Sequence, residues 1–262
     1  MNILIKLFAS NYFISLRKLI FHFSLKISGY KNFGNFYDTG EDYLFSQIKK
    51  FNIKNVLDVG AHTGAFSKKL LENENINVIA FEPMKKNFIR LKKLENDYKY
   101  RFKCFNIALS NRIGNTKIYY TNPSSQLSSI AINLNKINFL KNKKIKKQNI
   151  KIDTLDNLIA KNKKIFKNKI DYIKIDTEGN DFKVLVGALK TIKKHKPQLI
   201  QIEMNYHYLF AGENLYQFSK FLTGYEVFQI MPFNNGLLKI DPSRPENNIF
   251  HLSNFIFKKK KN

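Results

Sequence analysis

The most constraining feature of the sequence is an apolar run that ends in a glycine-containing turn, followed by a second apolar run that ends in an acid. These two segments span residues 56–66 and 79–83. Glu82 lies 22 positions after Gly60, close to the roughly 20-residue interval between the glycine turn and the ribose-binding acid of a Rossmann-type unit. Glycine lets the backbone turn tightly beside a ligand, and a carboxylate can accept two hydrogen bonds from a diol. The pair predicts a site for a nucleoside-bearing ligand. The alternative is an ordinary strand–turn–helix joint with Glu82 solvated.

The turn itself narrows the choice of nucleoside. A dinucleotide fingerprint has glycine at its first, third and sixth positions, which here hold Gly60, His62 and Ala65. Without the second glycine the backbone cannot approach a pyrophosphate closely, so NAD is disfavoured, and no Gly-Lys-Ser/Thr follows for a phosphate loop. The remaining pattern, Asp-x-Gly-x-His-x-Gly from Asp58 to Gly64, resembles the first motif of S-adenosylmethionine-dependent methyltransferases, with its middle glycine replaced by His62. S-adenosylmethionine carries no phosphate, so it tolerates a less open turn.

Composition restricts the class of protein. A length of 262 residues suffices for one domain with a large core. The single cysteine, Cys104, lies in an alternating apolar segment, which favours a core position and a reducing, cytoplasmic compartment. The net charge of +25 invites a nucleic-acid interpretation, but lysines are scattered and arginine is rare, so we expect no nucleic-acid partner. Two lysine clusters, 141–147 and 258–261, are interpreted as solvated loops or tails, or as sites for anionic lipid or acidic glycan.

The N-terminal segment is strongly apolar but is interrupted by Lys6, Arg17, Lys18 and Lys26. Its longest uncharged stretch lies between Lys6 and Arg17 and is too short to cross a bilayer, which needs about 20 residues. Residues 1–30 fit either an amphipathic helix at the inner face of the membrane or a helix packed on the domain. The predicted organisation is an apolar helical segment (1–37), a methyltransferase-like domain (38–257) and a basic tail (258–262).

Apolar periodicity predicts strands that alternate with helices. Strands are expected at 55–59, 77–82, 102–108, 170–176 and 199–203, and helices at 65–72, 85–96, 180–193 and 214–222. This alternation predicts a mostly parallel sheet with helices on both faces. A helix before the first strand is expected to have Thr39 as its N-cap. A further β element is expected at 116–121. The polar segment 122–150 is interpreted as a lid or as locally disordered. Two late strands, 225–231 and 249–257, follow each other without a helical crossover and fit an antiparallel edge pair.

Acidic residues stand at the carboxyl ends of the predicted strands, where open α/β sheets bind ligands. They are Asp58, Glu82, Asp176 with Glu178, and Glu203. A purely structural sheet has no need of so many acids at strand ends, so we expect them to share one site. Asp176 is interpreted as a base or as an acceptor for a ligand amino group. Its alternative role is capping of the next helix, to which Asn180 and Asp181 are also suited.

Several motifs occur together in a fixed order. They are Asp-Val-Gly-Ala-x-x-Gly (58–64), Phe-Glu-Pro (81–83), Asn-x-Ala-Leu-Ser (106–110), Thr-Leu-Asp (154–156) and Ile-Lys-Ile-Asp-Thr-Glu-Gly-x-Asp (173–181). The set, within residues 55–257, resembles the FkbM family of S-adenosylmethionine-dependent methyltransferases. The resemblance implies a class I methyltransferase (Rossmann-like) α/β fold, with a mostly parallel seven-stranded sheet, helices on both faces and an antiparallel edge pair at the C-terminus. It also implies S-adenosyl-L-methionine as cofactor and O-methylation of a hydroxyl, often on a sugar or natural product.

The resemblance further implies roles for the matching residues. The expected cofactor-binding residues are Asp58, Gly60, Ala61, His62, Gly64, Glu82, Pro83, Asn106, Ala108 and Asp176. Among them, the two glycines and Asp58 would shape the methionine pocket, and Glu82 would hold the ribose. Asn106 and Ala108 would lie beside the adenine. His62 departs from the Asn that is common at its place, which leaves its role open.

Methyl transfer to a hydroxyl requires the oxygen to be aligned behind the methyl carbon and its proton to be removed by a base. The catalytic candidates are Asp176, Glu178 and His62. By the resemblance, the two acids would face the reacting end, and His207 is a weaker candidate. We assign no metal site, although Asp176, Glu203 and Asn205 offer hard oxygen ligands for a divalent ion at adjacent strand ends.

Two other functions remain open. A nucleic-acid (RNA) methyltransferase is favoured by charge alone. However, Asp-Thr-Glu-Gly (176–179) stands where adenine N-methylating enzymes usually have Asn/Asp-Pro-Pro-aromatic, and no cysteine follows a proline as in cytosine C5 enzymes. A non-enzymatic, basic, membrane-associated binding protein on a Rossmann scaffold would bind no cofactor. The preferred acceptor is a hydroxyl of a sugar, a surface glycan or a related small molecule.

Overall fold

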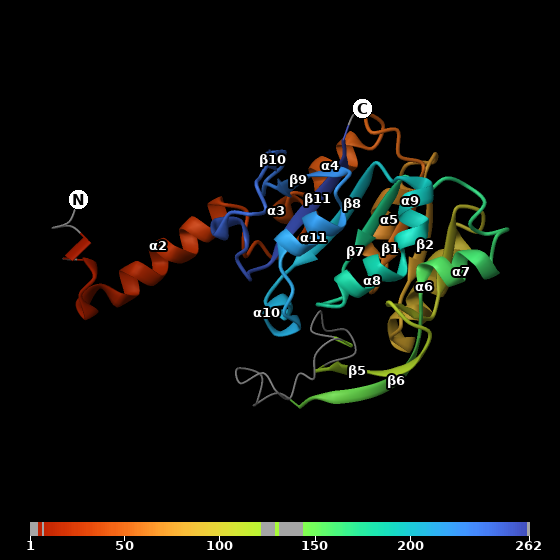
Figure 1. Cartoon of the computed structure of the whole chain (residues 1–262), viewed down its shortest axis with the longest axis horizontal. Helices are drawn as coiled ribbons and strands as arrows, with labels where there is room; N and C mark the ends of the chain where they lie inside the picture. The colour runs from red at the N-terminus through yellow and green to blue at the C-terminus, as the bar shows by residue number, and fades with distance from the viewer. Residues whose placement is uncertain (1–4, 7, 122–128, 131–143, 261–262) are drawn as a thin grey trace.

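The computed structural model describes residues 5–6, 8–121, 129–130 and 144–260. Its central element is an eight-stranded sheet with the strand order β10-β9-β11-β8-β7-β1-β2-β3 (Figure 1). The strands that pair in parallel are β1 (Asn55–Val59), β2 (Asn77–Phe81), β3 (Phe102–Phe105), β7 (Tyr172–Ile175) and β8 (Leu199–Met204). All pairings that involve β9 (Tyr225–Ile230), β10 (Leu237–Lys239) and β11 (Ser253–Lys259) are antiparallel.

Helices cover both faces of this sheet. They are α3 (Phe36–Thr39), α4 (Glu41–Gln47), α5 (Ala65–Leu71), α6 (Lys85–Asp97), α7 (Leu155–Lys161), α8 (Asp181–Gly187), α9 (Leu189–His195), α10 (His207–Ala211) and α11 (Leu215–Phe221). Successive strand residues point to opposite faces. Val56 of β1 therefore joins one hydrophobic core with Phe66 of α5, whereas its neighbour Leu57 joins a second core with Val184 of α8. The predicted mostly parallel sheet with helices on both faces is confirmed.

The closing strands differ in position from the prediction. They are antiparallel, as expected, but β11 is internal: Phe255 lies opposite Ile202 of β8 on one side and Gln229 of β9 on the other. The edge strand is β10, which adds an eighth strand to the seven expected. The run 255–257 is buried on both faces, as an internal strand requires. Lys258 also belongs to β11, so the predicted basic tail at 258–262 begins too early.

Two predicted elements are interrupted in the structure, and one predicted helix start is wrong. The strand expected at 102–108 is divided, because β3 ends at Phe105 and the chain continues as β4 (Ala108–Leu109) in another sheet. The helix expected at 180–193 is divided into α8 and α9 at Ala188. Thr39 is the last residue of α3 and not an N-cap. Gly40, in the left-handed region at φ +82°, separates α3 from α4.

A three-stranded sheet of order β4-β6-β5 lies beside the main sheet, with β5 (Gly114–Tyr120) and β6 (Lys146–Asp153) forming a long antiparallel pair (Figure 1). The β element expected at 116–121 is confirmed. The polar segment 122–150 is not a lid throughout, because β6 begins at Lys146. Its residues 122–128 and 131–143 lie outside the described part of the chain.

The helix α2 (Ile14–Ile27) follows a short 3₁₀ helix, Asn11–Phe13, and extends away from the rest of the molecule (Figure 1). Leu25 is its one buried residue. The chain just after α2 is anchored to the main sheet, because Gln229 Nε2 donates to the carbonyl of Ser28 at 3.0 Å and Ser253 Oγ donates to the carbonyl of Gly29 at 2.9 Å. Among the described helices, none combines the length and the hydropathy that a bilayer crossing requires.

Cys104 lies on β3 and is half-buried, with its Sγ donating to Glu95 Oε2 at 3.3 Å. Burial, followed by the hydrogen bond and the charge of Glu95, raises the pKa of this thiol to about 12. The thiol is therefore protonated at neutral pH and is not a nucleophile.

Candidate active site

The turn after β1 closes against the end of β7. Gly60 has φ +85°, and a Cβ built there would lie 1.8 Å from the backbone oxygen of Asp176. The N–H groups of Gly60 and Ala61 both donate to the carbonyl of Phe81 at 3.0 Å, and the N–H of Asp176 donates to Val59 at 2.9 Å. The carboxyl ends of β1, β2 and β7 thus meet at a position where only glycine fits.

The carboxylate of Glu82 fixes the same turn from the end of β2. Its Oε2 accepts a hydrogen bond from the N–H of His62 at 2.9 Å, and its Oε1 accepts one from the N–H of Met84 at 2.7 Å. His62 has φ +50°, in the left-handed region, within the turn that Glu82 holds. Burial raises the pKa of Glu82 to about 7, although the two backbone donors lower it. The acid found by its spacing from Gly60 therefore holds the glycine turn directly.

Asp58 lies fully buried on β1. Its Oδ2 accepts a 2.6 Å hydrogen bond from Ser67 Oγ of α5. Among the described residues, none donates a hydrogen bond to Asp58 Oδ1. Burial raises the pKa of Asp58, while the charge of Lys174 and the Ser67 hydrogen bond lower it. A buried acceptor atom without a donor is suited to a ligand that brings an ammonium or hydroxyl group.

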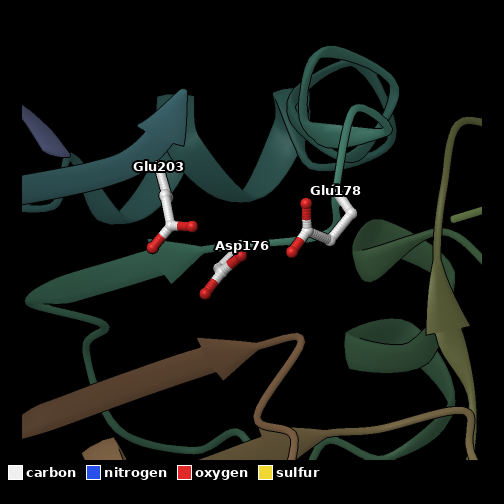
Figure 2. A group of neighbouring side chains, drawn as sticks. All are labelled: Asp176, Glu178 and Glu203. Carbon is white, nitrogen blue, oxygen red and sulfur yellow. The ribbon is translucent and has the colours of Figure 1, made fainter. Parts of the chain in front are cut away.

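Three carboxylates form a second group, which we call the acidic cluster: Asp176, Glu178 and Glu203 (Figure 2). Asp176 follows β7, Glu178 lies in the next loop and Glu203 is on β8. The parallel pairing of Ile175 with Ile202 brings Asp176 beside Glu203. One carboxylate oxygen from each residue lies within 4.8 Å of the others. Figure 2 shows the side chains of Glu178 and Glu203 converging on Asp176.

The three acids of the cluster have different partners. The Nζ atom of Lys174, buried on β7, lies 2.8 Å from Asp176 Oδ2. Burial lowers the pKa of Lys174, but the charges of Asp176 and its acidic neighbours outweigh this effect and hold the pKa well above its usual range. Asp176 is therefore paired with a cation. The carboxylate of Glu203 has no hydrogen bond or ion pair with any residue in the described part of the chain.

Burial also governs the protonation of the cluster. Desolvation is the largest cause that raises the pKa of Glu178 and of Glu203, and the negative charge of Asp176 raises both further. Closely spaced carboxylates cannot all ionise together at low cost, so the cluster retains a proton more readily than isolated acids do. A carboxylate with a raised pKa can accept a proton from a hydroxyl more effectively than an ordinary one.

His207 lies behind Glu178 and is fully buried. Its Nδ1 lies 2.7 Å from Glu178 Oε2 and 2.8 Å from Asn205 Oδ1, and Asn205 Nδ2 donates to the same Glu178 oxygen at 2.7 Å. Burial lowers the pKa of His207 to about 4, so the ring is neutral at pH 7 and the contact is a hydrogen bond, not an ion pair. Both neighbours of Nδ1 are acceptors, so this nitrogen carries the proton. His207 and Asn205 orient Glu178.

The loop that carries Asp176 and Glu178 is shaped by the buried Asp181. Its two oxygens accept hydrogen bonds from the N–H groups of Thr177 and Gly179, at 3.1 and 3.2 Å. Asn180 is the N-cap residue of α8 but makes no side-chain capping bond; its amide donates to the carbonyl of Leu109 at 2.9 Å. The helix-capping role considered for Asp176 is not observed, because its carboxylate bonds Lys174.

One cavity of about 410 Å³ joins the glycine turn to the acidic cluster. Its volume falls in the range of roughly 300–1,000 Å³ found for small-molecule sites. The predicted residues that line it are Asp58, Gly60, Ala61, His62, Glu82, Pro83, Ala108, Asp176 and Glu178. An apolar part of its wall is formed by Phe81, Met84, Ile107, Leu109, Ile118 and Ile130. The structure therefore brings most of the predicted residues to one site.

Four residues that the sequence analysis considered for the site do not line the cavity. Gly64 is the N-cap residue of α5, and a Cβ there would lie 2.7 Å from Leu91 Cδ2, so it shapes the turn. Asn106 donates its amide to the carbonyls of Glu82 and Pro83, at 2.9 and 3.1 Å, and braces the loop. Its expected contact with the cofactor stays a prediction. His207 and Asn205 lie behind Glu178, as described above.

The sequence interpretation gave too little weight to two residues that line the cavity, Glu203 and Lys174. The sequence predicts that Glu203 shares the site with the other strand-end acids, but the only individual role it suggests for Glu203 is that of a potential metal ligand. Lys174 stands two positions before Asp176 in a buried strand, so both side chains point to the same face. A lysine in such a strand is a signal for a buried carboxylate partner. The Asn205 oxygen named for a metal bonds His207 instead, and Glu178 takes its place in the cluster.

Comparison with known proteins places the chain in a family. Residues 58–230 match the family model described as the methyltransferase FkbM domain. A search of curated proteins gave no match.

Solved structures of similar fold include an O-methyltransferase from Bacillus cereus in complex with SAH, with 10% identity and a TM-score of 0.48, covering 93% of this chain and 90% of that one. A putative caffeoyl-CoA O-methyltransferase from Staphylococcus aureus has 13% identity and a TM-score of 0.45, covering 95% and 98%. A putative RNA methyltransferase from Pyrococcus horikoshii has 15% identity and a TM-score of 0.39, covering 93% and 98%. The α/β fold, with its central sheet and antiparallel C-terminal strands, is of the class I methyltransferase type.

Proposed function

The chain belongs to the methyltransferase FkbM domain family, and from this premise we propose that it is an S-adenosyl-L-methionine-dependent O-methyltransferase. Its acceptor is a hydroxyl of a sugar, a surface glycan or a related small molecule. The observation that carries the proposal is the single cavity that joins Glu82 and the glycine turn to the acidic cluster. A methyl donor at one end and a proton acceptor at the other are what O-methylation requires. The single cysteine, Cys104, leaves no disulfide within the chain, which is in keeping with action in the reducing cytoplasm.

The residues present fit the cofactor. Glu82 is positioned at the cavity wall to accept the ribose hydroxyls, and each of its oxygens retains acceptor capacity beyond its one backbone donor. Asp58 Oδ1, to which no described residue donates a hydrogen bond, is suited to the cofactor ammonium. Ile107 and Leu109 offer an apolar surface for the adenine, together with Ala108. S-adenosylmethionine supplies the electrophilic methyl group when bound.

The acidic cluster acts on the acceptor. Glu203 is the best-placed base, because it lines the cavity, has no described donor and has a raised pKa. It takes the proton of the acceptor hydroxyl as the new oxygen–carbon bond forms and the carbon–sulfur bond breaks. Glu178, held by Asn205 and His207, orients the hydroxyl by accepting a hydrogen bond. Carboxylates are common partners of sugar hydroxyls for the same reason.

The proposal is tested by calorimetric titration of the purified chain with S-adenosylhomocysteine, with NAD as the control ligand. We expect S-adenosylhomocysteine to bind and NAD not to bind. A folded sample that binds neither would overturn the methyltransferase proposal, since both the family and the cavity demand a nucleoside ligand. Transfer of a radiolabelled methyl group to glycan fractions then identifies the acceptor class.

Replacement of the proposed base should separate chemistry from binding. In Glu203→Gln the carboxylate is lost with little change of shape, so we expect kcat to fall by about 10²–10⁴ with the affinity for S-adenosylhomocysteine within a few-fold of the wild type. His62→Asn is the matched control, because Asn tolerates the left-handed conformation at φ +50°. If His62→Asn loses activity and Glu203→Gln keeps it, the base is His62.

An RNA acceptor is the second candidate, and the net charge of +25 favours it. The charge is spread along the chain, whereas the carboxylates at the reacting end of the cavity would repel a phosphate backbone. The same radiolabel assay with total RNA distinguishes the two. Label in RNA that ribonuclease removes would replace the glycan proposal.

A further inference from the structure

The helix α2 carries an apolar stripe along one side. Its members are Leu16, Leu19, Ile20, Phe23 and Ile27, which stand at i, i+3, i+4, i+7 and i+11. Residues at this spacing lie on one face of an α-helix. All five side chains are exposed, between 38% and 67% of their surface. A contiguous apolar stripe of this kind on a charged protein marks a binding surface.

The stripe faces away from the domain. Leu25 is buried, and the ring of Phe21 lies 6.5 Å from that of His251, so another side of the helix meets the domain. The end of α2 is fixed to the sheet by the Ser28 and Gly29 carbonyls, and the N–H of Tyr30 donates to the Leu25 carbonyl at 2.8 Å. α2 is therefore an outward-projecting arm with a fixed root (Figure 1).

The charges around the stripe are all of one sign. With 3.6 residues per turn, Lys26 lies at one flank of the stripe and Arg17 at the other, whereas Lys18 lies on the opposite side of the helix, close to the buried Leu25. The first acidic residue of the chain is Asp38, so no acid precedes or interrupts α2. A basic helix with a clean apolar face is complementary to a surface that offers both negative charge and hydrocarbon.

We propose that α2 is a docking helix for an anionic phospholipid bilayer. The stripe enters the boundary between headgroups and acyl chains, with the helix axis along the membrane plane, and the flanking Lys26 and Arg17 lie at the lipid phosphates. A neutral bilayer offers the hydrocarbon without the charge, and an acidic protein surface offers the charge without a hydrocarbon layer deep enough for Leu19 and Phe23. The bilayer is the occupant that matches both features.

Docking would place the cavity close to the membrane. The segment that directly follows the root of α2 lines the cavity through Asn32, Phe33 and Phe36. The N–H of Lys31 donates to the carbonyl of Leu252, another lining residue, at 2.7 Å. If the proposed function holds, an acceptor attached to a lipid would meet the cavity at the headgroup layer. This consequence rests on the proposed function, whereas docking itself does not.

Co-sedimentation of the full chain with phosphatidylcholine vesicles, with and without phosphatidylglycerol, tests the docking. We expect binding only to the vesicles that contain phosphatidylglycerol, weakened by added salt. The double variant Leu19→Gln/Phe23→Gln should lower the partition coefficient at least tenfold, because each side chain loses its transfer to hydrocarbon. Lys26→Gln should lower it about fivefold, whereas Lys18→Gln, on the opposite side of the helix, should lower it less.

The matched control is Ile89→Gln/Ile113→Gln, which alters two exposed apolar residues away from α2 and should bind like the wild type. Equal binding by the α2 variant, or no binding by the wild type, would overturn the proposal. Sedimentation velocity without vesicles tests whether a second copy of the chain occupies the stripe instead. A wild-type dimer that Leu19→Gln/Phe23→Gln converts to a monomer would assign the stripe to this second copy. Unchanged S-adenosylhomocysteine affinity in the variant would show that the domain is intact.

Discussion

A Gly60→Ala variant should lose both cofactor binding and much of its stability. The new Cβ would lie 1.8 Å from the backbone oxygen of Asp176, and the residue would keep φ +85°. The left-handed backbone costs an alanine roughly 1–2 kcal/mol, and the overlap with a buried backbone atom costs typically about 1–3 kcal/mol more. We expect the free energy of unfolding to fall by about 2–5 kcal/mol, the sum of these two costs.

Cofactor binding is lost because the end of β7 must move to make room for the new Cβ. Relief of the overlap displaces the end of β7, which carries Asp176, away from the glycine turn, and the cavity opens between its two halves. Denaturant titration and S-adenosylhomocysteine calorimetry measure the two effects. Gly224→Ala is the matched control: its Cβ meets nothing within 4 Å and its φ lies outside the left-handed region, so it should unfold like the wild type. Wild-type stability and affinity in Gly60→Ala would contradict the close packing of this turn.

Glu82→Ala should have the largest effect on affinity for S-adenosylhomocysteine. It removes the two hydrogen bonds that the ribose hydroxyls would donate to this carboxylate. Hydrogen bonds to a charged group are worth about 1.5–3 kcal/mol each, so we expect Kd to rise by at least about a hundredfold. The N–H groups of His62 and Met84 also lose their acceptor, which costs some stability. Calorimetry gives the affinity, and far-ultraviolet circular dichroism shows whether the chain is folded. A folded Glu82→Ala that binds as the wild type does would remove the ribose role of Glu82.

Because the pKa of Glu82 is raised, both the stability of the chain and its affinity for S-adenosylhomocysteine should depend on pH. In the free chain the carboxyl has a pKa of about 7, above its ordinary value of 4.5. Its contribution to stability is therefore present below pH 4.5 and is lost as the pH rises through 7. Ribose hydroxyls would donate to the ionised form and lower the pKa, so binding should release a proton near pH 6–7 and affinity should rise with pH across this window. Titrations in buffers of different ionisation enthalpy count the proton, and Glu82→Gln should release none.

Both predictions concern residues that hold the fold and the site at once. Gly60 brings three strand ends together, and Glu82 holds the turn while it faces the cavity. Glu203 differs, because no described residue depends on its carboxylate. Its replacement is therefore expected to alter the chemistry with little change in stability.

The sequence by itself determined the order of the elements and one half of the site. Hydrophobic periodicity is a local property, so β1, α5, β2, α6, β7 and β8 follow from it to within a few residues. The interval between Gly60 and Glu82 is also fixed locally, because one helix and one strand of ordinary length separate them. Residues that lie close together through a single β–α–β unit can be recognised without a structure.

Only the tertiary structure decided what depends on contacts between distant segments. The insertion of β11 between β8 and β9, the interruption between β3 and β4, and the outward projection of α2 are set by packing that no local pattern records. The same holds for the acidic cluster. Glu178 receives its donors from Asn205 and His207, and Glu203 lies beside Asp176, because β7 and β8 lie side by side. Burial and neighbouring charge set the protonation of these acids, and both arise only when the chain is folded.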